Sequence, residues 1–292
     1  KVIYSISHIY VDKGILMYDI FQTEKLIELW LTEDIGHCDL TVQLMIPEDA
    51  LGTFYMNARE PMYIAGLDVA ARVFCKYDSR LQVTRHVKDG DQVQQGTKLL
   101  TVTGPARSIL TAERPALNIA QRLCGIATET ARYNAEIQGT KARLIDSRKT
   151  TPGLRMLEKH AVVCGGGLNH RLGLDSGVML KDNHIVIAGS IFNAVASARK
   201  LLPILTKIEV ECDRIDQEIE ALEAGADVIM LDNMSLEDMA KSVEIVAGKA
   251  KIEASGGIHI KTIQAIAKTG VDYISTSKIT QAAPPVDIGL DD

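Results

Sequence analysis

The sequence has few aromatic residues, no long apolar run and no excess of basic charge. Only thirteen of its 292 residues are Phe, Trp or Tyr, and 32 Lys and Arg stand against 38 Asp and Glu, a net charge of −6. Nucleic-acid-binding surfaces are usually basic and carry stacking aromatic side chains. A membrane-spanning helix needs about 18 or more consecutive apolar residues. We therefore expect no nucleic-acid partner, no membrane segment, and small molecules as ligands.

Clustered cysteines and an export signal are also missing. The five cysteines are scattered, form no C-x-x-C pair and stand at positions 38, 75, 124, 164 and 212. Disulfide frameworks and zinc sites both favour an even, clustered set, so the cysteines predict free thiols in a reducing, cytoplasmic environment. Residues 1–21 lack the charged, apolar and small-residue segments of an export signal.

What is present predicts a globular α/β chain. Apolar residues make up 46% and charged residues 24% of it, a balance that allows a sizeable core. Apolar spacing predicts helices over residues 21–34 and 108–137, and two extended runs broken at Pro61 between residues 52 and 67. Residues 87–104, with Asp-Gly and Gly punctuation, predict a hairpin.

Residues 89–100 also resemble the first half of a lipoyl or biotinyl carrier domain. Such a domain presents a modifiable Lys on the next hairpin turn, and no Lys-centred turn follows here. The segment therefore predicts a structural β-layer rather than a carrier.

From about residue 140 the pattern alternates short apolar runs with helical stretches, which is typical of βα units around a parallel sheet. Residues 214–225 place Ile215, Ile219 and Leu222 on one helical face. Residues 235–248 open with a capping box and close on a glycine.

Polar residues recur at the predicted carboxyl ends of these strands. Glu211, Asp232, Ser255 and Ser277 follow one another at separations of 21, 23 and 22 residues. In α/β barrels these strand ends form the catalytic face, and the loops after the last strands commonly hold a phosphate. The Ser255-Gly256-Gly257 turn, placed before a predicted helix, suits an anion.

Basic residues concentrate between residues 141 and 184. This window holds eight Lys and Arg against four acids, a balance of +4 in a chain that is otherwise −10. Arg suits carboxylates and Lys suits phosphate oxygens, so the window predicts a multiply anionic ligand. The alternative is a solvated basic face, which Arg155 and Lys159 fit better than the others. Glu211 and Asp232 predict a Mg²⁺–phosphate anchor, or else partners of nearby Lys and Arg.

Eight ordered motifs over almost the whole chain resemble the quinolinate phosphoribosyltransferase family. They are EDIGHCDLT, ILTAERPALNIAQRLCGIAT, DSRKTTPGLR, GGGLNHRLGLDSGVMLKDNH, IEVEC, MLDN, EASGGI and DIGL. The resemblance implies a type II phosphoribosyltransferase, with an N-terminal α/β sandwich domain over 1–115 and an incomplete seven-stranded α/β barrel over 116–283. It also implies that residues 284–292 return to the first domain.

The resemblance implies roles for individual residues. The chain would act as a homodimer in which Arg114 completes the neighbour's site. Lys149, Lys181, Glu211 and Asp232 would be catalytic, and the two acids would lie near the ribose and Mg²⁺, directly or through substrate and water. The residues that bind quinolinate, phosphoribosyl pyrophosphate or its 5′-phosphate would be Arg114, Ser147, Arg148, Lys149, His170, Arg171, Lys181, Glu211, Asp232, Ser255, Gly256, Gly257 and Ser277.

The implied reaction joins quinolinate nitrogen to C1 of phosphoribosyl pyrophosphate, expels pyrophosphate and releases CO₂, which gives nicotinate mononucleotide for NAD biosynthesis. Two positions depart from the family pattern, where glycine is usual: Cys38 and Ser277. Three alternatives stay open. They are a Schiff-base aldolase with Lys181 as nucleophile, the related pyrophosphorylase found with molybdate transport, and a non-catalytic binding protein of the same fold.

Overall fold

The computed structural model describes residues 10–11, 14–15 and 18–292, which form two compact units. Unit 1 comprises Lys1–Ala131, Thr151–Gly166 and Ala283–Asp292, and unit 2 comprises Arg132–Thr150 and Gly167–Ala282. Most of the segment tested for an export signal lies outside the described residues. No helix in the described ranges is long and apolar enough to cross a bilayer.

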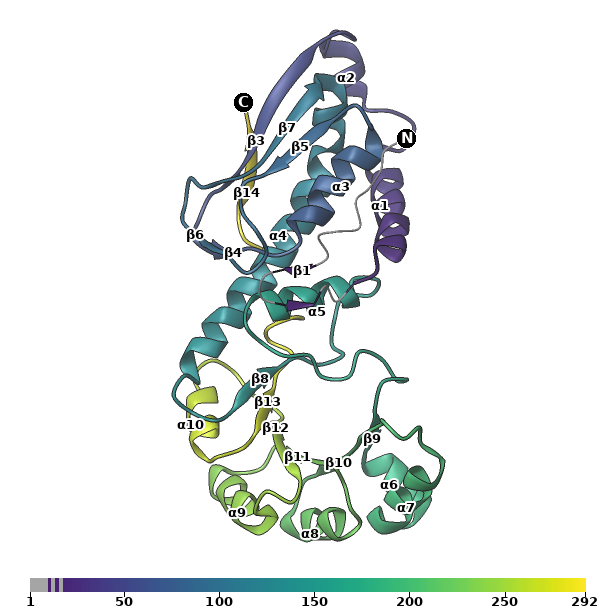
Figure 1. Cartoon of the computed structure of the whole chain (residues 1–292), viewed down its shortest axis with the longest axis vertical. Coiled ribbons are helices and arrows are strands. Elements are labelled where there is room, and N and C mark those ends of the chain that lie inside the picture. Colours follow the sequence, from purple (N-terminus) through teal and green to yellow (C-terminus); the bar gives the residue numbers. More distant parts are fainter. Residues whose placement is uncertain (1–9, 12–13, 16–17) are drawn as a thin grey trace. The chain divides into compact units, whose positions relative to one another are not determined.

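Unit 1 is built on a four-stranded antiparallel sheet of order β14-β3-β7-β5 (Figure 1). Helix α3 packs against β5 and β7, and α1 packs against α3. Its elements are β1 (Tyr10–Val11), β2 (Gly14–Ile15), α1 (Ile20–Ile35), α2 (Leu40–Met45), β3 (Leu51–Ala58), β4 (Met62–Tyr63), α3 (Leu67–Tyr77), β5 (Gln82–Arg85), β6 (Gln92–Val93), β7 (Lys98–Pro105), α4 (Ala106–Glu136, which continues into unit 2), α5 (Arg155–Cys164) and β14 (Ile288–Asp291).

In this unit the structure differs from the sequence analysis in two respects. The hairpin predicted over residues 87–104 does not form, because β6 pairs with β4 while β7 pairs with β3 and β5. The domain boundary expected between residues 115 and 116 falls inside α4, which continues past Pro115 to Glu136. At the other end of the chain, β14 pairs with β3.

Unit 2 is built on a parallel sheet of order β8-β13-β12-β11-β10-β9. A single parallel bridge between Ile145 and Leu168 lies beyond β8, so the expected seventh strand is reduced to one residue pair. Its elements are β8 (Arg143–Ile145), β9 (Val178–Leu180), α6 (Asp182–Ala188), α7 (Ile191–Leu201), β10 (Ile208–Cys212), α8 (Ile215–Glu223), β11 (Val228–Asp232), α9 (Leu236–Val246), β12 (Lys251–Ser255), α10 (Ile263–Lys268) and β13 (Tyr273–Ser275).

The helices of unit 2 pack against the sheet and against one another. Helices α7 to α10 contact β9 to β13 in chain order, as βα units require (Figure 1). Helix α9 begins as its capping box predicts, because Ser235 accepts a hydrogen bond from the Asp238 N–H at 3.1 Å. Helix α8 differs from expectation: Glu218 is fully buried and accepts a hydrogen bond from Ser242 at 2.6 Å, while Ile219 is 40% exposed.

Alternation of side chains along the strands positions the site. Successive residues of a strand point to opposite faces. In β10 the apolar set Ile208, Val210 and Cys212 is fully buried, and Glu209 and Glu211 belong to the other set. The face that carries these two glutamates is the one that holds the candidate site.

Candidate active site

The carboxyl ends of the strands in unit 2 surround a cleft of about 790 Å³, a volume typical of small-molecule sites. Every site residue predicted within unit 2 lines this cleft. They are Ser147, Arg148, Lys149, His170, Arg171, Lys181, Glu211, Asp232, Ser255, Gly256, Gly257 and Ser277. The structure therefore brings together residues that are up to 130 positions apart in the sequence.

Strand register explains how three of these side chains converge. Asp232 and Ser255 are paired across β11 and β12, and Glu211 is paired with Met230 across β10 and β11. Lys181 follows β9 directly and is the N-cap residue of α6. Because neighbouring parallel strands end at the same edge, the polar residue that ends each strand lies at the cleft.

Three cationic side chains of the cleft have no acidic partner among the described residues, whereas Lys181 pairs with Glu211. Arg148, Lys149 and Arg171 form no ion pair with an acidic side chain in the part of the chain that the structure describes. Burial and then the neighbouring Arg148 lower the pKa of Arg171. The Nε of Arg148 is buried and has no hydrogen-bond partner among the described residues. Both arginines are partly buried, and an unpaired cation that has lost part of its hydration is costly, so this arrangement suits an anionic ligand.

His170 is held by three buried carboxyl groups, Asp146, Glu209 and Glu253, none of which the sequence analysis named as a site residue. Its backbone N–H donates to Asp146 at 2.8 Å, and its Nδ1 accepts from the Arg171 N–H at 2.7 Å. That bond assigns the ring proton to Nε2, which lies 2.9 Å from Glu209 and 3.5 Å from Glu253. Burial and the neighbouring Glu209 raise the pKa of Glu253 well above its usual range.

The sequence does hold a signal for the missed glutamates. Glu209 stands two residues before Glu211, and Glu253 stands two residues before Ser255, so each shares the face of a predicted site residue. A charged residue inside an otherwise apolar strand, in phase with a site residue, is therefore informative. The strand-end pattern alone overlooked it.

The two predicted metal-binding acids have different surroundings. Lys181 Nζ forms an ion pair with Glu211, the alternative partner that the sequence left open. Asp232 accepts a hydrogen bond from its neighbour Asn233 at 2.8 Å. Both carboxylates line the cleft and offer the oxygen ligands that Mg²⁺ prefers. The donor set fits Mg²⁺ through Asp232 more directly than through Glu211.

The glycine turn after β12 is required by a close approach. Gly256 has φ +89°, and a Cβ there would lie 2.3 Å from Asn233 Oδ1. Asn233 itself has φ 55°, and its N–H donates to the Ser255 carbonyl at 3.0 Å. The helix expected to follow the turn begins only at Ile263. The predicted anion site therefore depends on the loops rather than on a helix end.

The remaining predicted residues belong to unit 1. Arg114 lies on α4, with its side chain 57% exposed and 4.0 Å from Glu113. The solvated face expected for Lys159 is wrong, because Lys159 is fully buried on α5, and Arg155 is partly buried. Position 38 carries an exposed, free cysteine.

Comparisons with known proteins agree over most of the chain. The family models for the N-terminal and C-terminal domains of quinolinate phosphoribosyl transferase match residues 39–124 and 126–291. A probable nicotinate-nucleotide pyrophosphorylase of Bacillus subtilis is 41% identical, covering 92% of this chain and 93% of that protein. A Mycobacterium leprae enzyme of that name is 40% identical over 89% and 94%.

A solved structure has about the same sequence identity to this chain as these relatives. The nicotinate-nucleotide pyrophosphorylase of Francisella tularensis superposes with a TM-score of 0.91 at 40% identity, covering 95% of this chain and 99% of that one. The fold and both domains are thus shared with proteins of this name.

The raised pKa of Glu253 predicts a pH-dependent effect of replacing it. In the unfolded chain Glu253 ionises near pH 4.5, whereas in the folded chain it holds its proton to higher pH. The folded state therefore loses stability as pH rises from 4.5 through the folded pKa. We expect Glu253→Gln, which is neutral throughout, to raise the melting temperature relative to the parent, and more at pH 8 than at pH 5.

Thermal unfolding of both proteins at the two pH values measures this difference. Glu244→Gln, at an exposed position, is the matched control and should show no such trend. An advantage of Glu253→Gln that is equal at pH 5 and pH 8 would contradict the assignment.

Proposed function

The chain belongs to the quinolinate phosphoribosyl transferase family, and we propose that it transfers the phosphoribosyl group of phosphoribosyl pyrophosphate to quinolinate. The products are nicotinate mononucleotide, pyrophosphate and CO₂. The observation that carries this proposal is the cluster of Arg148, Lys149 and Arg171 without acidic partners in one cleft. Two substrates rich in carboxylate and phosphate oxygens supply the missing negative charge.

Quinolinate is proposed to bind where the cationic side chains are partly buried. A guanidinium binds a carboxylate through two parallel hydrogen bonds, and both Arg148 and Arg171 line the cleft. Arg171 is oriented by a 3.0 Å hydrogen bond from its Nη1 to the Gly177 carbonyl. A ligand with one carboxylate would leave one of these cations unpaired, so the site favours a dicarboxylate.

The ribose and the leaving group are proposed to lie near the strand ends. Departure of pyrophosphate builds positive charge on the ribose, which the carboxylates of Glu211 and Asp232 stabilise. Lys181, held by Glu211, is placed to neutralise the pyrophosphate. We propose that Asp232 and phosphate oxygens hold Mg²⁺, with Glu211 in contact through substrate or water. The ion supplies charge neutralisation of the leaving group.

The 5′-phosphate is proposed to bind at the loops after β12 and β13. Ser255, Gly256, Gly257 and Ser277 line this part of the cleft, and glycines at positive φ let backbone N–H groups approach an anion. Ser277 offers a hydroxyl where the family usually has glycine.

Decarboxylation needs no further group from the chain. Once the ring nitrogen is quaternary, the pyridinium holds the electron pair that CO₂ leaves behind. We propose that the chain's contribution is to hold the ring against the partly buried Arg171. The aldolase alternative needs Lys181 as a free amine, whereas its Nζ contacts Glu211.

Arg171→Ala tests the assignment of the quinolinate site. We expect a higher quinolinate KM and a fall in kcat/KM of more than tenfold, about 1.4 kcal/mol or more, because one carboxylate loses its partner. Steady-state kinetics with quinolinate as the varied substrate measures the change. Arg143→Ala, an exposed arginine outside the cleft, is the control and should retain parental kinetics. Unchanged quinolinate kinetics in Arg171→Ala would overturn the assignment.

We infer that the chain forms a homodimer in the cytoplasm. All five cysteines are free, as a reducing compartment favours. Large apolar side chains are exposed on both units, including Leu44 (80%) on α2 and Ile187 (88%) on α6, and such surfaces commonly mark interfaces. We propose a dimer in which unit 1 of one chain contacts unit 2 of the other, so that apolar side chains of both units are covered and the exposed Arg114 reaches the partner's cleft.

Mixing two inactive variants tests this shared site. Arg114→Ala and Lys149→Ala chains should each be nearly inactive, and after dissociation and reassociation should recover about one quarter of parental activity. Half of the dimers are then mixed, and each has one of two sites intact. Mixing Arg114→Ala with a chain that carries both substitutions is the control and should recover nothing. No recovery in the first mixture would show that Arg114 serves its own chain or none.

A further inference from the structure

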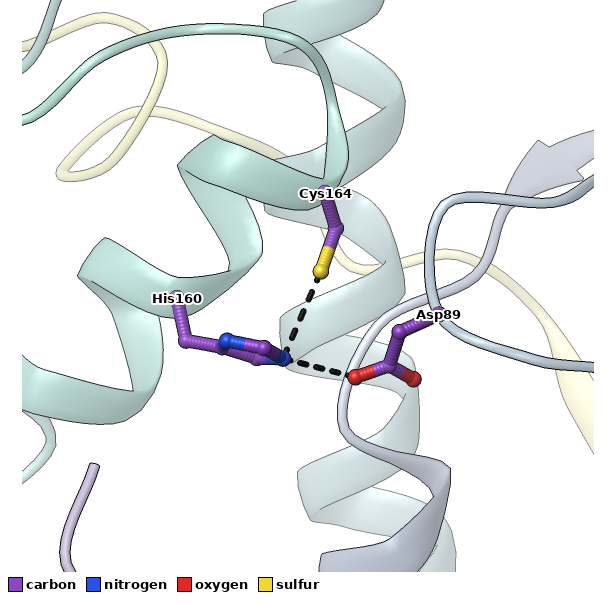
Figure 2. Close-up of side chains that lie close together, drawn as sticks. All are labelled: Asp89, His160 and Cys164. Atoms are coloured by element: carbon purple, nitrogen blue, oxygen red, sulfur yellow. Dashed lines mark hydrogen bonds and ion pairs between the residues drawn. The ribbon is translucent and has the colours of Figure 1, made fainter. Parts of the chain in front are cut away.

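Three metal-ligating side chains meet in unit 1, in a part of the chain that the proposed reaction does not use. Asp89 lies in the loop between β5 and β6, and His160 and Cys164 lie one turn apart on α5. Figure 2 shows the three side chains pointing toward one another from these two segments. The scattered cysteines predicted no zinc site, because only the fold brings Asp89 to this turn of α5.

The three ligand atoms are close enough to bind one ion. His160 Nε2 lies 2.6 Å from Asp89 Oδ2 and 3.4 Å from Cys164 Sγ, and all three atoms are within 4.8 Å of one another. A tetrahedral zinc ion places bound nitrogen and sulfur about 3.5 Å apart, and nitrogen and oxygen about 3.3 Å apart. The Nε2–Sγ separation of 3.4 Å already fits, and the Nε2–Oδ2 separation of 2.6 Å has to lengthen by about 0.7 Å.

Hydrogen bonds within the cluster do not satisfy its donors and acceptors. Asp89 and Cys164 both contact the same nitrogen of His160, which can either donate to the carboxylate or accept from the thiol. The other ring nitrogen, Nδ1, is buried without a partner among the described residues, and it carries the ring proton when a cation binds Nε2. A cation bonded to Nε2 takes the place of the single proton that this nitrogen can carry. The nitrogen, the Asp89 carboxylate and the Cys164 sulfur can then all bind the cation at once.

The cluster is unsuited to nucleophilic catalysis. In a catalytic Cys-His-Asp arrangement the thiol and the carboxylate contact opposite nitrogens of the ring. Here they share Nε2, so the ring cannot relay a proton from the thiol to the carboxylate. A bound divalent cation is the partner that stabilises a thiolate in such a position.

The surroundings orient the ligands. The second oxygen of Asp89 accepts a hydrogen bond from the Gly66 N–H at 3.0 Å. The ring of Tyr18 contacts the His160 ring edge to face, with centroids 5.0 Å apart. The exposed fraction of the Asp89 side chain is 9%, and Cys164 is partly exposed, so an ion can enter and a water can complete the tetrahedron.

We propose that Asp89, His160 and Cys164 form a zinc site with three protein ligands and one water. The mixed N, O and S donor set favours Zn²⁺ over Mg²⁺ or Ca²⁺, which prefer oxygen ligands. Binding joins the loop after β5 to α5. Along the sequence, α5 lies between two segments that line the cleft, Ser147–Lys149 and His170–Arg171.

Cobalt(II) added to the metal-free full-length protein tests the site. A thiolate bound to cobalt gives an intense near-ultraviolet charge-transfer band, and we expect it to saturate at one equivalent. The group His170, Glu209 and Glu253 also offers ligand atoms but contains no sulfur, so it cannot produce this band. Zn²⁺ should abolish the band by displacement and raise the melting temperature of the protein.

Matched variants separate this site from other thiols. Cys164→Ser should lose the band and bind Zn²⁺ at least about tenfold more weakly, and Asp89→Asn should weaken Zn²⁺ binding while keeping the sulfur ligand. Cys75→Ser, at another partly buried free cysteine, should retain both. The proposal fails if the folded parent protein gives no band, or if the band persists in Cys164→Ser. Neither result bears on quinolinate turnover, which is measured separately.

Discussion

His170 is held between Glu209 and Glu253, and the electrostatics of the cleft depend on these contacts. Both glutamates are buried on the inner face of the parallel sheet. Burying carboxyl groups is costly unless they are protonated or partnered. Glu253 retains its proton to higher pH and Glu209 contacts the imidazole. The sheet thereby holds His170 and the adjacent Arg171 at the cleft. There the cationic groups of Arg148, Lys149 and Arg171, which have no acidic partners among the described residues, can bind anionic substrates.

Local signals in the sequence predicted the elements well, and the contacts between them less well. The helix expected over residues 21–34 is α1, Ile20–Ile35, and the strand ends converge as expected. Hydrogen bonding within a helix and alternation along a strand are properties of neighbouring residues, so spacing reveals them. The pairing of β6 with β4 depends on residues about thirty positions apart, which turn chemistry does not specify.

Buried polar residues were the least predictable feature. Lys159 on α5 and Glu218 on α8 are fully buried, although their residue types are usually exposed. Glu218 is accommodated by a hydrogen bond from Ser242 on α9. The same dependence on a distant partner holds for the cluster of Asp89, His160 and Cys164, in which Asp89 is more than seventy residues from the other two. Their chemistry follows from the fold rather than from a motif.

The coupled release of CO₂ tests the central claim most directly. Quinolinate labelled in its C2 carboxylate is incubated with the protein, phosphoribosyl pyrophosphate and Mg²⁺, and both CO₂ and nicotinate mononucleotide are measured. The account predicts one labelled CO₂ for each nicotinate mononucleotide formed, and no labelled CO₂ when phosphoribosyl pyrophosphate is left out. Absence of both products, or release of label without phosphoribosyl pyrophosphate, would contradict it.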